Sequence, residues 1–415
     1  ITALFDEGTF NEVDSFAKSG DGSAEVVAGY GEVDGCPVYA FVQNSDVDGG
    51  AMSKAQAAKI KKIYDLAVKT GSPVVGIYDS IGGRLNQGAD MLAAYYARGE
   101  DSAELFEALK ISKAESYEKH RNQYDVIKVN MQEFLSMTHS MDEMLVMLQK
   151  YLIFDLMDHF ETVRFRDEHN LIQVMKDIYS KTNHSFIILI DEWDCLFREY
   201  KQDKEAQKKY LDFLRAWLKD KDYVALAYMT GILPIKKYGS HSALNMFTEY
   251  SMTDPGDLAE YFGFTEKEVF ALCEKYDMSF EEAKMWYDGY QLIAHRQTGN
   301  EIYSMYSPKS VVEAMLRHKF GTYWNQTETY EALKIYIQMD MDGLKDSVVR
   351  MLAGDAVSIH IGTFSNDMTT FATKDDVLTL LVHLGYLTYN STAETVSIPN
   401  KEVSQEYINA RRYFR

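Results

Sequence analysis

Two adjacent carboxylates, Asp191 and Glu192, are the residues of this sequence whose types and spacing best suit catalysis. They directly follow a run of apolar residues, FIILI at 186–190. Such a run is typical of a strand that is buried on both faces of a parallel sheet. Ligands bind beyond the carboxyl ends of such strands, where one carboxylate can hold Mg²⁺ and the next can orient a water molecule. The pattern favours a nucleotide hydrolase, while a buried strand that ends in a solvated acidic turn stays open as the alternative.

The composition is that of a folded, acidic chain. Its 415 residues predict about two or three domains. An apolar content of 46%, with 13% aromatic residues, is enough to build substantial cores. The formal charge of −20 argues against broad nucleic-acid binding, because contacts with phosphates need clustered Lys and Arg. A local basic site stays possible within that limit.

The cysteines and the hydropathy of the sequence indicate the cellular compartment to expect. Cys36, Cys195 and Cys273 are scattered and show no C-x-x-C spacing, which favours thiols of a cytosolic protein over a disulfide set or a zinc site. The sequence has no apolar run of about 20 residues, and we expect no signal peptide. We therefore expect a cytoplasmic protein with no membrane partner. The chain begins at Ile1 and ends at Arg415, and we expect both ends to be interrupted rather than natural.

The first 88 residues are rich in glycine and differ in composition from the residues that follow them. Short strands are predicted at 24–29 and 37–43, with a hairpin turn between them at Asp34-Gly35. A helix is predicted to end near Lys69, and the strand at 73–78 leads into a glycine loop.

Three stretches of this segment, LFDEGTF, VAGYGEVDGCPVYAFVQNSDVDGGAMS and GSPVVGIYDSIGGRL, resemble the N-terminal part of biotin-dependent acyl-CoA carboxyltransferases. These are the beta-type subunits of acetyl-CoA and propionyl-CoA carboxylases, with a crotonase-like fold. The resemblance implies that the N–H groups of Gly49, Gly50, Gly82 and Gly83 would stabilise acyl and carboxyl oxyanions. Alternatively, these glycines simply form turns. The match covers a small part of the family's length, so we expect neither turnover nor acyl-CoA as a ligand.

From residue 89 to about 260 the sequence alternates between strands and helices, which predicts a parallel α/β domain. The predicted strands are 125–131, the acidic strand, and a second buried strand at 224–230 that ends in Thr230. Helices are predicted after a capping box of Ser140 and Glu143, and in the segments 171–180 and 206–217.

The remaining residues predict a helical region at 261–345 and a winged-helix-like segment at 346–415. Thr265 with Glu268 forms a capping box in the first of these regions. In the second, a helix at 375–384 and a hairpin at 385–398 give the outline of a winged helix. Its acidic surroundings favour a packing module over a DNA reader.

A second resemblance rests on motifs in a fixed order. They are ELFEALKI, QYDVIKVNM, FIILIDEWD, YMTGILPI, LNMFTEYSM, EYFGFTEKEV, WYDGYQL, MYSPKSVVEAM, TYWNQT, HLGYLTY and IPNKEV. The order resembles that of the prokaryotic AAA-ATPase-like family, which pairs a P-loop ATPase with a helical region and usually a nuclease-like domain of the PD-(D/E)XK type. The resemblance implies ATP and Mg²⁺ as cofactors, with Asp191 as the metal ligand, Glu192 as the general base and Thr230 as a γ-phosphate sensor.

The chain departs from that family at the phosphate-binding loop. No Gly-Lys dipeptide occurs in it, and the loop that ends in Gly-Lys-Ser/Thr supplies the main phosphate contacts. We therefore expect weak or absent ATP binding. A non-catalytic interaction module, with an unknown protein partner, stays open as an alternative.

The two resemblances meet near residues 85–92 without a polar linker, although whole domains are normally joined by one. We interpret the chain as a chimera of an incomplete crotonase-like segment (1–88) and an ATPase-like α/β domain (89–260). A degenerate natural gene is the alternative. In either case, the strand at 73–78 could lie in the sheet beside the acidic strand.

Overall fold

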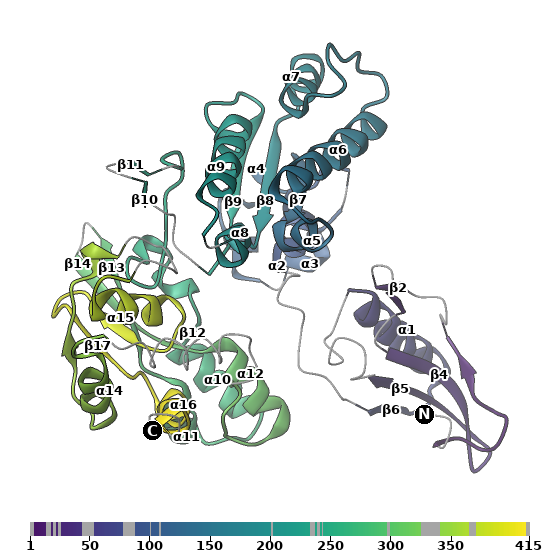
Figure 1. The fold of residues 1–415 in the computed structure, drawn as a ribbon. Helices are drawn as coiled ribbons and strands as arrows, with labels where there is room; N and C mark the ends of the chain where they lie inside the picture. Colours follow the sequence, from purple (N-terminus) through teal and green to yellow (C-terminus); the bar gives the residue numbers. More distant parts are fainter. Residues whose placement is uncertain are drawn as a thin grey trace. The chain divides into compact units, whose positions relative to one another are not determined.

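The chain folds into two compact units, Ile1–Met91 and Leu92–Arg415 (Figure 1). The structure is a computed structural model, and it describes residues 4–13, 18–19, 22–23, 26–43, 54–77, 88–99, 101–107, 109–200, 202–232, 237–238, 241–242, 244–296, 299–324, 341–364 and 371–411. The sequence predicts a first boundary after residue 88. The further predicted boundaries, after residues 260 and 345, stay predictions.

The smaller unit is a four-stranded sheet with the order β1-β4-β5-β6. β4 (Val26–Val33) and β5 (Cys36–Gln43) form the predicted antiparallel hairpin. Its turn residues, Asp34 and Gly35, have φ of 50° and 71°, as a tight hairpin turn requires. The other elements are β1 (Asn11–Glu12), β2 (Lys18–Ser19), β3 (Gly22–Ser23), α1 (Lys54–Thr70) and β6 (Val74–Ile77).

One face of this sheet is covered by α1. Ile63 and Ala67 of the helix pack against Val26, Ala28 and Phe41 of the sheet, and all five are almost fully buried. The smaller unit therefore has an apolar core of its own.

The strand β6 lies in this sheet and not beside the acidic strand, so that expectation is wrong. β6 pairs in parallel with β5, from Tyr39↔Val74 to Val42↔Ile77. The two edges of the acidic strand are both taken by other strands. Elements that follow one another in the sequence usually lie side by side, and α1 is the element between β5 and β6 in the chain.

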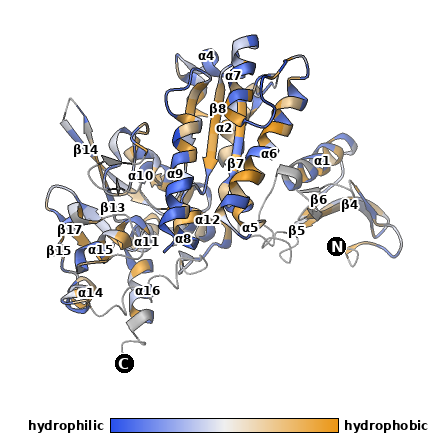
Figure 2. Ribbon diagram, turned by 45° about the horizontal axis from the view of Figure 1, so that its top comes forward, coloured by the Kyte–Doolittle hydropathy of each residue, from blue (hydrophilic) through white to orange (hydrophobic). Residues whose placement is uncertain are grey.

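The larger unit contains a parallel sheet of β7 (Asp125–Asn130), β8 (Phe186–Asp191) and β9 (Val224–Met229), in that order. β8 is central, and its residues from Phe186 to Ile190 are at most 2% exposed. Figure 2 shows this apolar strand in orange among its covering helices. The prediction of a buried parallel strand before the two carboxylates is confirmed.

Helices on this sheet begin where the sequence places their caps. Ser140 accepts a hydrogen bond from the N–H of Glu143 at the start of α6 (Met141–His159). The apolar faces of α6, α7 (Leu171–Thr182) and α9 (Lys204–Leu218) share one core with Ile188 and Ile190. Shorter elements complete this part: α2 (Gly88–Tyr96), α3 (Ala103–Phe106), η4 (Lys110–Lys113), α4 (Tyr117–His120), α5 (Met131–Ser136), α8 (Cys195–Glu199), β10 (Lys237–Tyr238) and β11 (His241–Ser242).

The strand β9 forms as predicted, but it is not buried. Leu226 is 39% exposed and Tyr228 is 44% exposed. β9 lies at the edge of the sheet that the structure describes, and its side chains are less covered than those of the central strand β8. An apolar sequence predicts burial on both faces only where neighbours cover both of them.

Residues 261–345 are not purely helical, contrary to the sequence prediction. The helices α10 (Glu266–Lys275), α11 (Phe280–Tyr287) and α12 (Pro308–Arg317) are interrupted by a long hairpin of β13 (Tyr290–Arg296) and β14 (Gly299–Tyr306). Thr265 and Glu268 form the predicted capping box at α10. Further elements are η5 (Gly256–Tyr261) and β12 (Phe264–Thr265).

The C-terminal segment contains the predicted helix and hairpin, as α15 (Lys374–His383), β16 (Thr388–Asn390) and β17 (Thr395–Ser397). The strand β15 (Val357–Ser358) pairs with β17 and completes a three-stranded sheet. The remaining elements are α14 (Leu344–Leu352), η7 (Ile361–Thr363) and α16 (Lys401–Arg411). Assignment of this segment to the winged-helix class stays a prediction.

Candidate functional site

The ends of β8 and β9 bring Asp191 and Thr230 together. The main chain of Thr230 forms two hydrogen bonds with residues at the end of β8. Its N–H donates to the carbonyl of Ile190 at 2.9 Å, and its carbonyl accepts from the N–H of Trp193 at 3.0 Å. The Thr230 hydroxyl then donates to Asp191 Oδ1 at 2.5 Å. Two residues that are 39 positions apart in sequence thus share one hydrogen bond at the carboxyl edge of the sheet.

The Glu192 side chain does not stand free beside Asp191, since its carboxylate forms an ion pair with Arg198 of α8. Its backbone has φ of 52°, a left-handed conformation that is uncommon for residues other than glycine. Burial raises the pKa of Glu192 above its usual value, and Asp194 and Asp191 raise it further, while Arg198 acts in the opposite direction. Glu192 is therefore positioned by Arg198 and by backbone strain.

Arg198 and Asp194 belong to this arrangement, although the sequence analysis did not single them out. Asp194 is fully buried, and its Oδ2 accepts a hydrogen bond from the N–H of Ile232 at 3.2 Å. Arg198 Nε lies 3.8 Å from the same oxygen. The signal available in the sequence is the four-residue spacing between the two, which places them on one side of a helical turn.

The turn after β9 packs closely on these residues. A Cβ atom at Gly231 would lie 2.6 Å from Asp194 Oδ1 and 2.6 Å from the Trp193 ring, so only glycine fits there. The Trp193 carbonyl accepts a hydrogen bond of 2.8 Å from the buried hydroxyl of Tyr210. These contacts hold the two strand ends at a fixed spacing.

The predicted glycine positions Gly49, Gly50, Gly82 and Gly83 lie outside the described residues. Within the described part of the chain, no group of three or more His, Cys, Asp or Glu side chains could hold a metal ion. One or two carboxylates are nevertheless the usual protein contribution to Mg²⁺ at phosphate-transfer sites, where water and phosphate supply the other ligands. Asp191 with its hydroxyl neighbour fits that role.

The two parts of the chain match the models of two different protein families. Residues 88–240 match the model described as "Predicted AAA-ATPase". Residues 1–104 match the model described as "Carboxyl transferase domain". The chain joins segments similar to two protein families. The predicted double resemblance is confirmed, and the two matches overlap between residues 88 and 104, a range that includes α2.

Individual relatives match the N-terminal segment. The methylmalonyl-CoA decarboxylase subunit alpha of Propionigenium modestum is 47% identical over 105 residues, which is 23% of this chain and 20% of that protein. The propionyl-CoA carboxylase beta chain of Roseobacter denitrificans is 41% identical over 108 residues, 23% of this chain and 21% of that protein.

Among solved structures, transcarboxylase 12S, described with methylmalonyl-coenzyme A and methylmalonic acid bound, is 33% identical over 22% of this chain and 20% of that chain, with a TM-score of 0.21. This chain spans about a fifth of the length of the curated relatives it matches.

Proposed function

We propose that the unit Leu92–Arg415 is an ATPase-type module that carries the metal side of a Mg²⁺–nucleotide site. The observation that supports this proposal is the hydrogen bond between Thr230 and Asp191 at the ends of two adjacent parallel strands. These strands lie within the residues that match the ATPase model. The carboxyl edge of a parallel sheet is where nucleotide phosphates bind in such proteins.

Each residue has a distinct role in this proposal. Asp191 would hold Mg²⁺. A bound Mg²⁺ ion would neutralise negative charge on the phosphates. Thr230 orients the Asp191 carboxylate through its hydroxyl, and it would sense a terminal phosphate by turning that hydroxyl from Asp191 to the phosphate. Glu192 would accept a proton from water, and it must first separate from Arg198 because an ion-paired carboxylate is a weaker base.

This site has few groups that could bind the phosphates of a nucleotide. The sequence has no Gly-Lys dipeptide, and Arg198 is already paired with carboxylates. Charge-assisted hydrogen bonds contribute about 1.5–3 kcal/mol each, so the loss of several weakens binding by orders of magnitude. The net charge of −20 adds repulsion. We expect ATP to bind with Kd of about 1 mM or weaker, and no hydrolysis above background.

Titration calorimetry with ATP, with and without Mg²⁺, tests the proposal. We expect weak binding that depends on Mg²⁺ and is lost in Asp191→Asn. Asp212→Asn, which removes an exposed carboxylate of α9, is the matched control and should bind as the parent does. Equal binding by Asp191→Asn and the parent would overturn the proposal, as would no Mg²⁺-dependent heat at several times the expected Kd.

A second candidate function is acyl-CoA binding by the unit Ile1–Met91. It is favoured by the 47% identity to a methylmalonyl-CoA decarboxylase subunit. The short extent of the match argues against turnover. Titration with methylmalonyl-CoA tests it, and saturation below about 0.1 mM would favour this candidate over the nucleotide module.

We further propose that the C-terminal segment is a winged-helix-like packing module in a cytoplasmic protein. The order α14, β15, η7, α15, β16 and β17 supports this class. Among the described residues, no helix is long and apolar enough to cross a membrane. A gel-shift assay with duplex DNA at physiological salt is expected to show no binding.

A further inference from the structure

The outer face of α6 carries an apolar stripe that the described residues leave open to solvent. Its members are Met147, Tyr151 and Phe154, of which Tyr151 is 53% exposed and Phe154 is 71% exposed. The opposite face of the helix packs into the core through Leu148 and Leu152. A contiguous group of large exposed apolar side chains is typical of a surface that binds another molecule.

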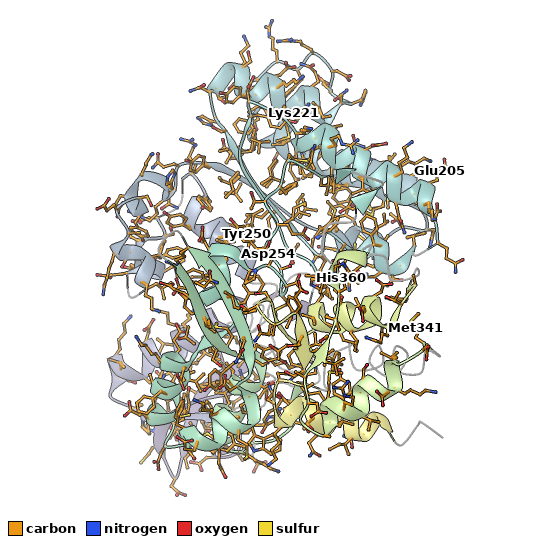
Figure 3. All side chains as sticks on the ribbon, turned by 90° about the vertical axis from the view of Figure 1, so that its left-hand side faces the viewer. Glu205, Lys221, Tyr250, Asp254, Met341 and His360 are labelled. Carbon is orange, nitrogen blue, oxygen red and sulfur yellow. The ribbon has the colours of Figure 1, made fainter. Side chains whose placement is uncertain are left out.

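Contacts with two neighbouring helices position α6. Asp142 in its first turn forms an ion pair of 3.0 Å with Lys209 of α9, and Lys209 also lies 3.7 Å from Glu205, which is labelled in Figure 3. The ring of Tyr151 meets the ring of Phe134 in α5 edge-on, with 6.0 Å between the ring centroids. The stripe is therefore presented on a helix whose place in the unit is fixed.

The spacing within the stripe is that of a seam between two helices. Tyr151 follows Met147 by four residues, and Phe154 follows Tyr151 by three. This alternation is the a/d pattern of a coiled coil, with Tyr151 at an a position and the other two at d positions. A second helix fits such a stripe, because side chains at a and d enter the gaps between side chains of a facing helix.

Two charged residues border the stripe on opposite sides. Lys150 directly precedes Tyr151 and takes position g, and Asp155 directly follows Phe154 and takes position e. Both side chains are exposed, and neither forms an ion pair within the described part of the chain. In a parallel pair of helices, a g residue lies beside the e residue five positions later on the partner. Lys150 and Asp155 have that separation, so two parallel copies of α6 would pair opposite charges twice.

We propose that two copies of this chain associate through α6, in parallel, about a two-fold axis that runs along the helix. Tyr151 and Phe154 fill the centre of the contact, and Lys150 of each copy lies beside Asp155 of the other. An antiparallel pair lacks this match, because it places each flank of the helix beside the same flank of the second copy.

The contact is short, and its length limits its strength. Asp158 is the next position of the stripe after Phe154, and two Asp158 carboxylates would repel each other there. About two helical turns bury far less than the roughly 1,200 Å² of a standard stable interface. The net charge of −20 adds repulsion between copies. We therefore expect a weak dimer, with Kd of about 0.1 mM at physiological salt.

Sedimentation velocity of the full chain, from about 10 µM to about 0.5 mM, tests the proposal. We expect the sedimentation coefficient to rise with concentration. Phe154→Ala and Lys150→Glu should each weaken association at least about tenfold, through lost apolar contact and through repulsion by Asp155, respectively. Lys345→Glu, at an exposed lysine of α14, makes the same change in net charge and should associate as the parent does.

A mixture of two variants tests the parallel register. Lys150→Glu and Asp155→Lys should each be monomeric alone, because each places like charges side by side. An equimolar mixture of the two should associate as the parent does, since each variant supplies the charge that the other has lost. Circular dichroism of every variant shows whether it folds.

The proposal fails if the parent chain is monomeric over the whole concentration range. It also fails if Lys150→Glu associates as strongly as the parent, because association would then use another face of the chain. A mixture of Lys150→Glu and Asp155→Lys that stays as monomeric as its components would exclude the parallel register.

Discussion

Glu406 gives the sharpest prediction about stability. It lies on α16, four residues after Glu402, and both side chains have 0% exposure. Glu402 Oε1 accepts hydrogen bonds from the N–H groups of Tyr323 and Trp324, at 2.5 and 2.9 Å. The two carboxylate oxygens of Glu406 have no hydrogen-bond partner within the described ranges. Burial, together with the charge of Glu402, raises the pKa of Glu406 from 4.5 to about 7.

The sign of the pH dependence follows from this rise. The folded protein holds the proton of Glu406 more tightly than the unfolded chain does. This contribution to stability is therefore complete below about pH 4.5, and it is lost as the pH rises through about 7. A difference of one pKa unit between the folded and unfolded states corresponds to about 1.4 kcal/mol. The free energy of unfolding therefore falls by at most about 3 kcal/mol between pH 4 and pH 8.

Glu406→Gln should remove this dependence, because glutamine has nearly the shape of a protonated glutamate and carries no charge. We expect the variant and the parent to be about equally stable at pH 5. At pH 8 the variant should be more stable, by up to about 3 kcal/mol. Hydrogen exchange of the α16 amides, measured at several pH values after correction for the intrinsic rates, reports this local stability.

Glu281→Gln is the matched control, since Glu281 is an exposed glutamate in the first turn of α11. It should leave the pH profile of the α16 amides unchanged. The reasoning is refuted if Glu406→Gln and the parent show parallel profiles from pH 5 to pH 8. That outcome would mean that Glu406 is solvated or paired in solution.

Three further substitutions test the packing of the candidate site. Glu192→Gln should change the free energy of unfolding by less than about 1 kcal/mol, since partly exposed ion pairs contribute little; a much lower urea midpoint would show that Glu192 is a buried structural partner. Gly231→Ala should destabilise the protein by about 1–3 kcal/mol, because the added Cβ would overlap Asp194, and an unchanged thermal midpoint would contradict the geometry. Tyr210→Phe leaves the carbonyl of Trp193 without its donor and should cost about 1 kcal/mol in urea unfolding, whereas a neutral result would indicate that water replaces the hydroxyl.

The sequence alone determined the local elements of this protein. The apolar run before Asp191 predicted a buried parallel strand, and β8 is one. Ser140 and Thr265 predicted helix starts, and both side chains cap the helices that follow them. These predictions succeed because a cap or an apolar run depends on residues a few positions apart. The two family resemblances likewise depended on short motifs that occur in a fixed order along the sequence.

Only the tertiary structure decided which elements meet. It placed β6 beside β5, left the apolar strand β9 at an edge, and paired Glu192 with Arg198. No local pattern distinguishes an apolar strand at an edge from one in the centre of a sheet, because the difference lies in neighbours contributed by distant parts of the chain. The hydrogen bond between Asp191 and Thr230 likewise depends on the register of two strands, which is set by packing across the whole sheet.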